Sequence, residues 1–455
     1  MKSSFFIKDK TFYKALFSMM IIVTLQNLVA YSVNMADNIM LGRFSQEALS
    51  GAATVNQIFF IVQQFARSFG NALVALSAQY WGEHRVKPIR TITGITLKVG
   101  CAVGIVLVAV CIIIPGPLLR IFTSSEAIVN EGKSYLAIIV WTFLLFIISQ
   151  ILMAALRAVG TVNISFYISI VSLIINVGIN YVLIFGKFGF PKMGIVGAAI
   201  GTLIARIVEL AIVILYMAFK DKKLELFKGG MLERNKLLWK DYGKIYIPIM
   251  CASVLWGFSV PLQTAVLGHL STDAIAANSV ATTFYQYLKV VVMAVSSTSA
   301  VIIGQTIGKG DPEKVKAAGR SLSVIDIAIG VIMAALLVAL KNPLLSLYTL
   351  NDNAMTMAGN LILIMAVVMV GMSYQMPVSF GIIQGGGDAK FTMKMNLIST
   401  WLIVVPLTFM AAFWWKLPVE WVVVVVQSDQ IFKCLPTFIK FRKYNWFKKL
   451  TRENA

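Results

Sequence analysis

The chain has 455 residues, of which 58% are hydrophobic and 13% are charged, and its mean hydropathy is +0.81. Soluble domains carry about 25% charged residues, so this composition excludes a soluble globular protein and indicates a helical protein with several membrane spans. The formal net charge of +20 does not indicate nucleic-acid binding, because the basic residues gather on no single soluble face.

Apolar runs along the chain predict twelve membrane-spanning helices, since each span needs about 20 mostly apolar residues. The first run is too long for the apolar region of a signal peptide, so we expect it to stay as a span. The expected limits are 15–39, 51–77, 91–114, 134–156, 164–186, 194–218, 245–267, 275–303, 322–340, 361–383, 397–415 and 419–439.

Basic residues orient these spans. Most of the 40 Lys and Arg residues fall in connections that would lie on one side of the membrane, and short loops rich in Lys and Arg stay in the cytoplasm. We therefore expect a multi-pass protein of the cell inner (cytoplasmic) membrane, with both termini cytoplasmic. Membrane lipids, anionic ones included, are the expected surroundings of this positive charge.

The longest cytoplasmic connection divides the chain near its middle. It reads KDKKLELFKGGMLERNKLLWKDYGK and covers residues 220–244. The expected organisation is an N-terminal six-helix lobe over 1–219, this connection, and a C-terminal six-helix lobe over 245–455. Leucines and a tryptophan alternate with lysines in the connection, which predicts an amphipathic helix lying in the inner membrane interface.

The two halves form an internal repeat at a constant offset of 226 residues. Leu41 and Gly42 correspond to Leu267 and Gly268, and the same offset relates the pairs Ser45 and Ser271, Glu47 and Asp273, Ala48 and Ala274, Gln79 and Gln305, and Gly82 and Gly308. Six spans per half is an even number, so both halves enter the membrane in the same direction. The predicted fold is an all-α integral membrane protein with two six-helix lobes related by a pseudo-two-fold axis along the membrane normal.

A single carboxylate, Asp37, lies near the outer end of the first predicted span. A charged side chain at membrane depth costs several kcal/mol on insertion scales, so it is a hypothesis for ion coupling or substrate binding. The alternative is that Asp37 only reaches the lipid headgroup region and has no functional role. The repeat places Gln263 opposite Asp37, so the acid belongs to one half only.

Several strings of residues carry a resemblance to a known family. They are MADNIMLGRFSQEALSGAA, INVGINYVLIFGKFGF, GIVGAAIGT, PIMCASVLWGF, LGHLSTDAIAAN and IIQGGGDAK, in this order along nearly the whole chain. The set resembles the multidrug and toxic compound extrusion (MATE) family. The resemblance implies a membrane antiporter for xenobiotic transport, which exports mostly cationic, amphipathic drugs or metabolites by alternating access in exchange for protons or sodium ions.

The resemblance also implies a coupling site. Asp37 matches the acid of the family's first-helix pattern, and Asn176 and Thr202 match the amide on span five and the hydroxyl on span six. The second acid of that pattern is replaced here by Asn180, one helical turn after Asn176. We include Asn34 in this candidate ion-coupling and substrate-binding site.

The coupling ion stays open between H⁺ and Na⁺, and no other cofactor is expected. Oxygen ligands suit a hard cation, so the candidate sodium ligands are Asp37, Asn176, Asn180 and Thr202. The same groups could relay a proton, and the lone carboxylate favours protons. Partners are expected to be small organic cations, and the protein is expected to be a monomer. Candidate cavity residues are Arg67, Gln263, Tyr285 and Lys289.

Other polar residues and prolines within the spans are predicted to have structural roles. Arg206 with Glu209, and Asp429 with Lys433, have the spacing of pairs within one helix. Prolines within the spans of the second half, Pro377 and Pro406 among them, can break helices that line a cavity.

Enzymatic catalysis is not expected, because the chain has only two histidines and no triad or metal-ligand cluster gathers near them. The rival hypothesis is an exporter or flippase of lipid-linked saccharide with a related twelve-helix repeat. Such a protein should line its cavity with several cations to meet a pyrophosphate. The spans here hold few, and Asp37 has the sign suited to a cation.

Overall fold

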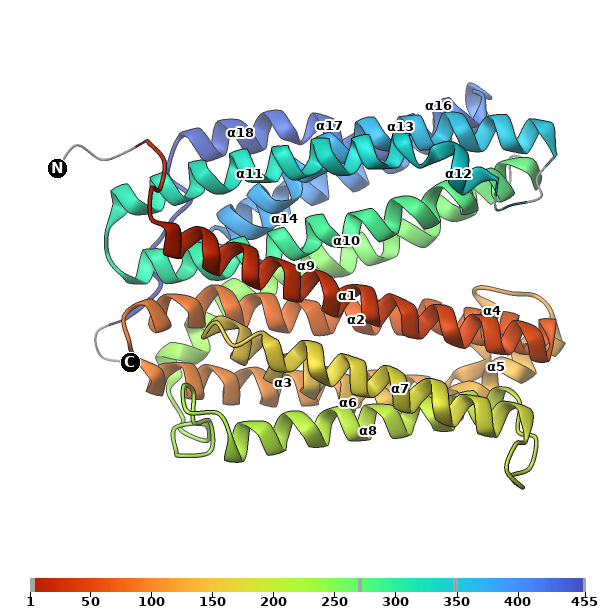
Figure 1. The fold of residues 1–455 in the computed structure, drawn as a ribbon, viewed down its shortest axis with the longest axis horizontal. Helices are drawn as coiled ribbons and strands as arrows, with labels where there is room; N and C mark the ends of the chain where they lie inside the picture. The colour runs from red at the N-terminus through yellow and green to blue at the C-terminus, as the bar shows by residue number, and fades with distance from the viewer. Residues whose placement is uncertain (1–4, 269–271, 347, 349–350, 453–455) are drawn as a thin grey trace. The chain divides into compact units, whose positions relative to one another are not determined.

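The structure is a computed structural model, and it describes residues 5–268, 272–346, 348 and 351–452. Within these residues the chain is helical and contains no strand (Figure 1). The helices are α1 Lys10–Phe44, α2 Gln46–Gly82, α3 Val86–Ile113, α4 Pro115–Arg120, α5 Glu126–Ile139, α6 Trp141–Ala158, α7 Asn163–Phe185, α8 Ile195–Phe219, α9 Lys236–Gly268, α10 Thr272–Gly308, α11 Pro312–Ala339, α12 Lys341–Leu345, α13 Asp352–Met376, η1 Pro377–Ile383, α14 Ala389–Asn396, η2 Leu397–Val404, α15 Val405–Phe409, η3 Met410–Trp414, α16 Val419–Gln427, α17 Asp429–Phe432 and α18 Cys434–Arg442.

Twelve helical segments of the described chain are long and apolar enough to cross a membrane, which confirms the predicted number. Several boundaries differ from the prediction. α1 and α2 are longer than their apolar runs, at 35 and 37 residues, because a helix can continue past the apolar zone while its backbone hydrogen bonds are kept. The predicted span 134–156 is interrupted at Val140, where α5 ends and α6 begins.

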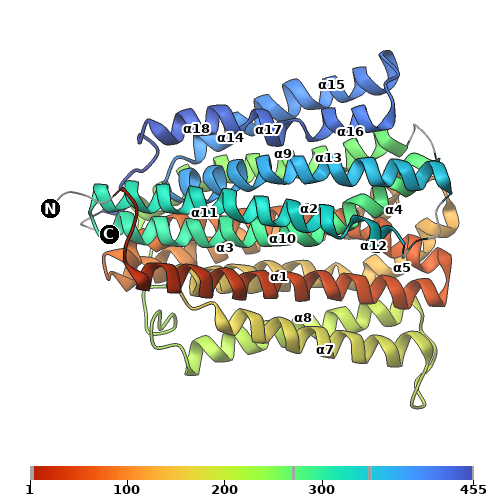
Figure 2. The same ribbon diagram turned by 45° about the horizontal axis from the view of Figure 1, so that its top comes forward.

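The chain divides into two compact units. Unit 2 consists of residues 25–77 and 84–246 among those described. In this unit α7 and α8 lie side by side (Figure 2). Gly197 of α8 faces Leu183 so closely that an added Cβ would lie 2.8 Å from the Leu183 carbonyl carbon. Small residues at such positions let two membrane helices approach backbone to backbone.

Unit 1 consists of the described parts of residues 1–24, 78–83 and 247–453. Its core is formed by apolar side chains of α10 and α13, with Met365, Met369 and Met372 fully enclosed. The lobe limits 1–219, 220–244 and 245–455 concern the organisation of the whole chain and stay a prediction.

Two prolines coincide with changes of helix type in unit 1. η1 is a π-helical stretch that begins at Pro377, and Pro406 lies in the short α15 between the π-helical η2 and η3. Proline lacks a backbone N–H, so the hydrogen-bond ladder around it can shift its register. In contrast, Pro248 lies within the continuous α9.

Residues that correspond in the internal repeat contact one another in unit 1. A Cβ on Gly82 would lie 2.2 Å from the Gln305 carbonyl oxygen, and a Cβ on Gly308 would lie 2.0 Å from the Gln79 carbonyl oxygen. Only glycine permits this approach at both positions. The repeat therefore has a local structural basis here, in two equivalent backbone contacts.

The prediction of an interfacial helix over 220–244 is wrong for residues 221–235. Residues 221–235 are irregular, and α9 begins at Lys236. The Asp221 carboxylate accepts hydrogen bonds from the backbone N–H groups of Leu224 and Glu225, and Gly229 and Gly230 adopt positive φ angles. These local interactions compete with a helix, and Leu224 is fully buried.

Asp388 connects the turn after η1 to the C-terminal segment. Its carboxylate lies 2.7 Å from Lys440 Nζ and 3.2 Å from Lys448 Nζ. Burial alone would raise the pKa of Asp388, but the hydrogen bond from Lys440 and the charges of both lysines outweigh it, and the pKa lies below its usual value.

We expect Asp388→Asn to lower the stability of the purified protein at neutral pH by about 1–2 kcal/mol. A lowered folded pKa contributes stability that is complete above the unfolded pKa of about 3.9 and is lost as the pH falls through the folded value. Thermal unfolding of both proteins from pH 7 to pH 3 measures this. The two melting curves should converge only at the acidic end, and a pH-independent gap would contradict the assignment.

Candidate functional site

Four of the predicted site residues meet in unit 2. Asp37 lies on α1, Asn176 and Asn180 lie one turn apart on α7, and Thr202 lies on α8. Asn180 Nδ2 donates to Asp37 Oδ1 at 2.6 Å and to Asn176 Oδ1 at 3.3 Å, and Asn176 Nδ2 donates to Thr202 Oγ1 at 3.1 Å. A continuous hydrogen-bonded chain thus runs from Thr202 to the carboxylate.

The amides of this chain are fully enclosed, with Asn176 and Asn180 1% and 0% exposed, whereas Asp37 is half-buried. Asn180 Oδ1 is buried and has no hydrogen-bond partner. A buried acceptor without a donor costs free energy, so this oxygen is a candidate ligand for a cation or a proton donor.

Gly201 makes room for the Asn180 amide. A Cβ on Gly201 would lie 2.0 Å from Asn180 Oδ1, so α8 must carry glycine here for the amide to keep its place. The last glycine of the string GIVGAAIGT, Gly201, therefore has a direct geometric link to the site.

We expect Gly201→Ala to displace the Asn180 side chain, destabilise the protein by about 1–3 kcal/mol through overpacking, and impair transport. Gly178→Ala on α7 is the matched control, because nothing lies within 4 Å of a Cβ at that position, and alanine favours a helix over glycine by about 0.5–1 kcal/mol. Melting temperature and transport rate should fall in the first variant only. Equal behaviour of the two would show that the tight contact does not matter.

Two residues near the site were missed by the sequence prediction. Tyr135 of α5 is buried and lies close to Thr202. Arg206 lies close enough to Asp37 to interact with it electrostatically. Arg206 follows Thr202 by four residues on α8, so helical spacing could have pointed to it. Tyr135 falls within the predicted span 134–156, but no local spacing in the sequence relates it to Thr202.

Both predicted ion pairs are present, the first within α8 and the second between the start of α17 and Lys433, which lies between α17 and α18. Arg206 Nη1 lies 2.6 Å from Glu209 Oε2, and Lys433 Nζ lies 2.6 Å from Asp429 Oδ2. Arg206 also lies over the Phe146 ring, 5.0 Å from its centroid. Glu209 therefore neutralises the cation that interacts with Asp37. Among the described residues, no group of three or more His, Cys, Asp or Glu side chains could hold a metal ion.

The other predicted candidates have different surroundings. Asn34 is exposed on α1 and Arg67 is half-buried on α2. Tyr285 is buried in the core of unit 1 and its hydroxyl donates to Met372 Sδ at 3.1 Å. Lys289 Nζ lies 5.3 Å from the centroid of the Trp256 ring. The side chain of Gln263 lies outside the described part of the structure. A cavity role for these residues stays a prediction.

The geometry sets what the site can bind. One carboxylate oxygen accepts from the Asn180 amide, which also donates to the Asn176 amide, and the Asn176 amide in turn donates to the Thr202 hydroxyl. A carboxylate can take a proton or pair with a cation, and the fixed amide orients it for either.

Comparisons with known proteins cover both halves of the chain. The MatE family model matches residues 23–182 and 248–410. The probable multidrug resistance protein NorM of Thermotoga maritima is 23% identical over 94% of this chain and 92% of its own length. The probable multidrug resistance protein NorM of Bacillus thuringiensis subsp. konkukian is 25% identical over 100% of this chain and 99% of its own length.

Solved structures share the fold. A mutant of the Vibrio cholerae MATE transporter VcmN has a TM-score of 0.86 at 18% sequence identity, and the match covers 95% of this chain and 97% of that one. The family model spans more than half of the chain, and the resemblance noted in the sequence is confirmed. The chain therefore belongs to the MATE family of multidrug efflux transporters.

Proposed function

We propose that this chain is a secondary active antiporter that exports cationic, amphipathic drugs or metabolites across the cytoplasmic membrane in exchange for protons. The observation that carries the proposal is the Asp37 carboxylate, held at 2.6 Å by Asn180 within a membrane-spanning unit. An unpaired carboxylate away from water costs much free energy. Such an acid must therefore be neutralised, by a proton or by a cation, whenever it is closed off from water.

Competition for one carboxylate couples the two flows. When the site is open to the outside, Asp37 takes a proton and releases a bound cation. When it is open to the inside, Asp37 loses the proton and binds the next cation. Exchange follows because both ligands cannot be held at once, and each ligand shifts the equilibrium between the two states only by its differential affinity for them.

Protons are favoured over sodium by the donor set. The Asn180 Nδ2 donor occupies a position beside Asp37 where a sodium site would need an oxygen, and only one carboxylate is present. Hard cations prefer carboxylate, carbonyl and water oxygens. Four oxygens could still be supplied if the side-chain amides of both asparagines flipped, which exchanges their oxygen and nitrogen atoms. The ligands would then be Asp37, Asn176, Asn180 and Thr202, so sodium is the alternative to be tested.

The test is transport in proteoliposomes with the two gradients imposed separately. A pH gradient without sodium should drive export of a fluorescent organic cation, and a sodium gradient at equal pH should not. The opposite result would replace the proton by sodium. Export driven by neither gradient would remove the antiport proposal itself.

We further propose that both termini face the cytoplasm, as the distribution of Lys and Arg indicates. Tags placed at either terminus should be protected from protease added to intact cells and should become accessible after the membrane is opened. Cleavage of one tag only, in intact cells, would contradict an even number of spans.

A further inference from the structure

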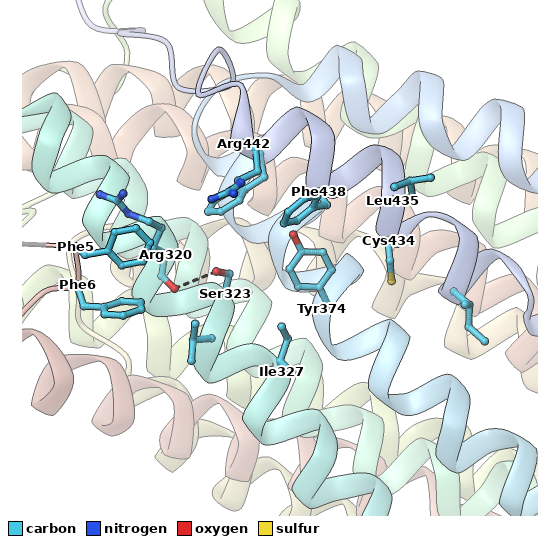
Figure 3. A pocket seen from close by; sticks show the side chains of 13 residues that line it. Phe5, Phe6, Arg320, Ser323, Ile327, Tyr374, Cys434, Leu435, Phe438 and Arg442 are labelled. Atoms are coloured by element: carbon cyan, nitrogen blue, oxygen red, sulfur yellow. Dashed lines mark hydrogen bonds between the residues drawn. The ribbon is translucent and has the colours of Figure 1, made fainter.

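A crevice on the surface of unit 1 is not used by the proposed transport site. It has a volume of about 620 Å³ and is lined by α11, α13, α17, α18 and the N-terminal residues Phe5 and Phe6 (Figure 3). Its walls are apolar, and several of the side chains that form them are exposed. The exposed fraction is 53% for Val324, 65% for Leu435 and 46% for Phe438. Exposed apolar side chains on spanning helices face lipid acyl chains.

Two guanidinium groups line this crevice. Arg320 lies in the first third of α11, and Arg442 is the last residue of α18, so both are near the same membrane face. Arg320 lies 4.2 Å from the centroid of the Phe5 ring, and Arg442 lies 5.4 Å from that of Phe438. Among the described residues, neither guanidinium forms an ion pair. Their positive charge is therefore available to an anion.

Hydrogen-bond donors in the crevice also lack partners. Arg320 Nε and the Tyr374 hydroxyl are buried atoms with no hydrogen-bond partner. Figure 3 shows the Tyr374 hydroxyl directed toward Phe438 and Arg442. A buried donor without an acceptor costs free energy. Both atoms are thus independent indications of a ligand that supplies oxygen acceptors.

We propose that this crevice binds an anionic phospholipid. The phosphodiester lies between Arg320 and Arg442, Tyr374 donates to a phosphate or ester oxygen, and an acyl chain lies along the exposed apolar wall. Guanidinium groups bind phosphate with several donors at once, and basic pockets between spanning helices are typical lipid headgroup sites. A transported organic cation would meet two like charges here.

This crevice carries positive charge and belongs to unit 1, whereas the proposed transport site carries a carboxylate and belongs to unit 2. Asp326 is close enough to Tyr374 to interact with it electrostatically, but it does not line the crevice. The net charge that an entering headgroup meets is therefore that of the two arginines. A soluble anion would leave the apolar wall unused, which favours an amphiphile over free phosphate.

The experiment titrates the purified full-length protein in detergent with phosphatidylglycerol or with phosphatidylcholine of the same acyl chains. Bound lipid is counted by native mass spectrometry, and the melting temperature is recorded in parallel. Arg320→Gln combined with Arg442→Gln removes the two charges. Lys390→Gln combined with Lys394→Gln is the matched control: it removes the same charge from the exposed face of α14, outside the crevice.

Phosphatidylglycerol should bind the wild type and raise its melting temperature, and phosphatidylcholine should not. The arginine variant should lose about tenfold or more in affinity, and the lysine variant should keep it. Tyr374→Phe retains the shape of the ring and should weaken binding to a smaller extent, which tests the site even if the arginine variant does not fold. Equal binding of both lipids, or an equal loss in the arginine and lysine variants, would overturn the proposal.

Discussion

Asp37→Asn is expected to abolish gradient-driven export while leaving the protein folded and inserted. The amide oxygen of the new side chain can still accept the hydrogen bond that Asn180 Nδ2 donates to Asp37 Oδ1 at 2.6 Å. The new side chain cannot carry a charge, however, so it can neither exchange a proton nor pair with a cation. The transport rate should fall by at least about tenfold, to the background of protein-free liposomes.

The stability of this variant shows whether a loss of export comes from lost ion coupling or from disturbed packing. Removal of a charge from the membrane interior removes its desolvation cost, so the melting temperature should be unchanged or slightly higher. The control is Gln263→Ala at the repeat-related position, which should be far milder. An Asp37→Asn protein that exports at the wild-type rate with the same pH profile would exclude this acid from the mechanism. Asp326, Asp429 and Glu209 would then be the acids to test.

The twelve spans could be predicted because hydrophobic length is a strong local signal in membrane proteins. The site on α1, α7 and α8 could be predicted in part. Asn176 and Asn180 share a helix face by spacing alone. Their approach to Asp37, more than 130 residues away in the chain, came from the family resemblance and not from any local pattern.

Features that depend on tertiary contact or on competing local hydrogen bonds could not be predicted. The leucines of segment 220–235 look amphipathic in sequence, yet the Asp221 carboxylate and two glycines with positive φ hold that segment out of a helix. The role of Gly201 is similar, because its contact with Asn180 Oδ1 depends on how closely α8 packs against α7.

Asn180→Asp is expected to change the ion that the protein uses. The Asn180 donor nitrogen lies 2.6 Å from Asp37 Oδ1, and the substitution would replace it with a carboxylate oxygen. Two carboxylates at this distance cannot both stay charged without a proton or a cation between them. With Asn176 Oδ1 and Thr202 Oγ1 nearby, the pair would also provide the oxygen-rich set that a sodium ion prefers.

Export by the Asn180→Asp protein should therefore become sodium-dependent at fixed pH, and added sodium should raise its melting temperature, since a ligand that binds only the folded state stabilises it. Neither effect is expected in the wild type. Asn180→Ala is the matched control, because it removes the same hydrogen bond without adding a charge, and it should lose transport without gaining a response to sodium. If the wild type and the Asn180→Asp protein responded equally to sodium, the amide at this position would not decide the choice of ion. The ligands of Asp37 would then have to be sought beyond α7.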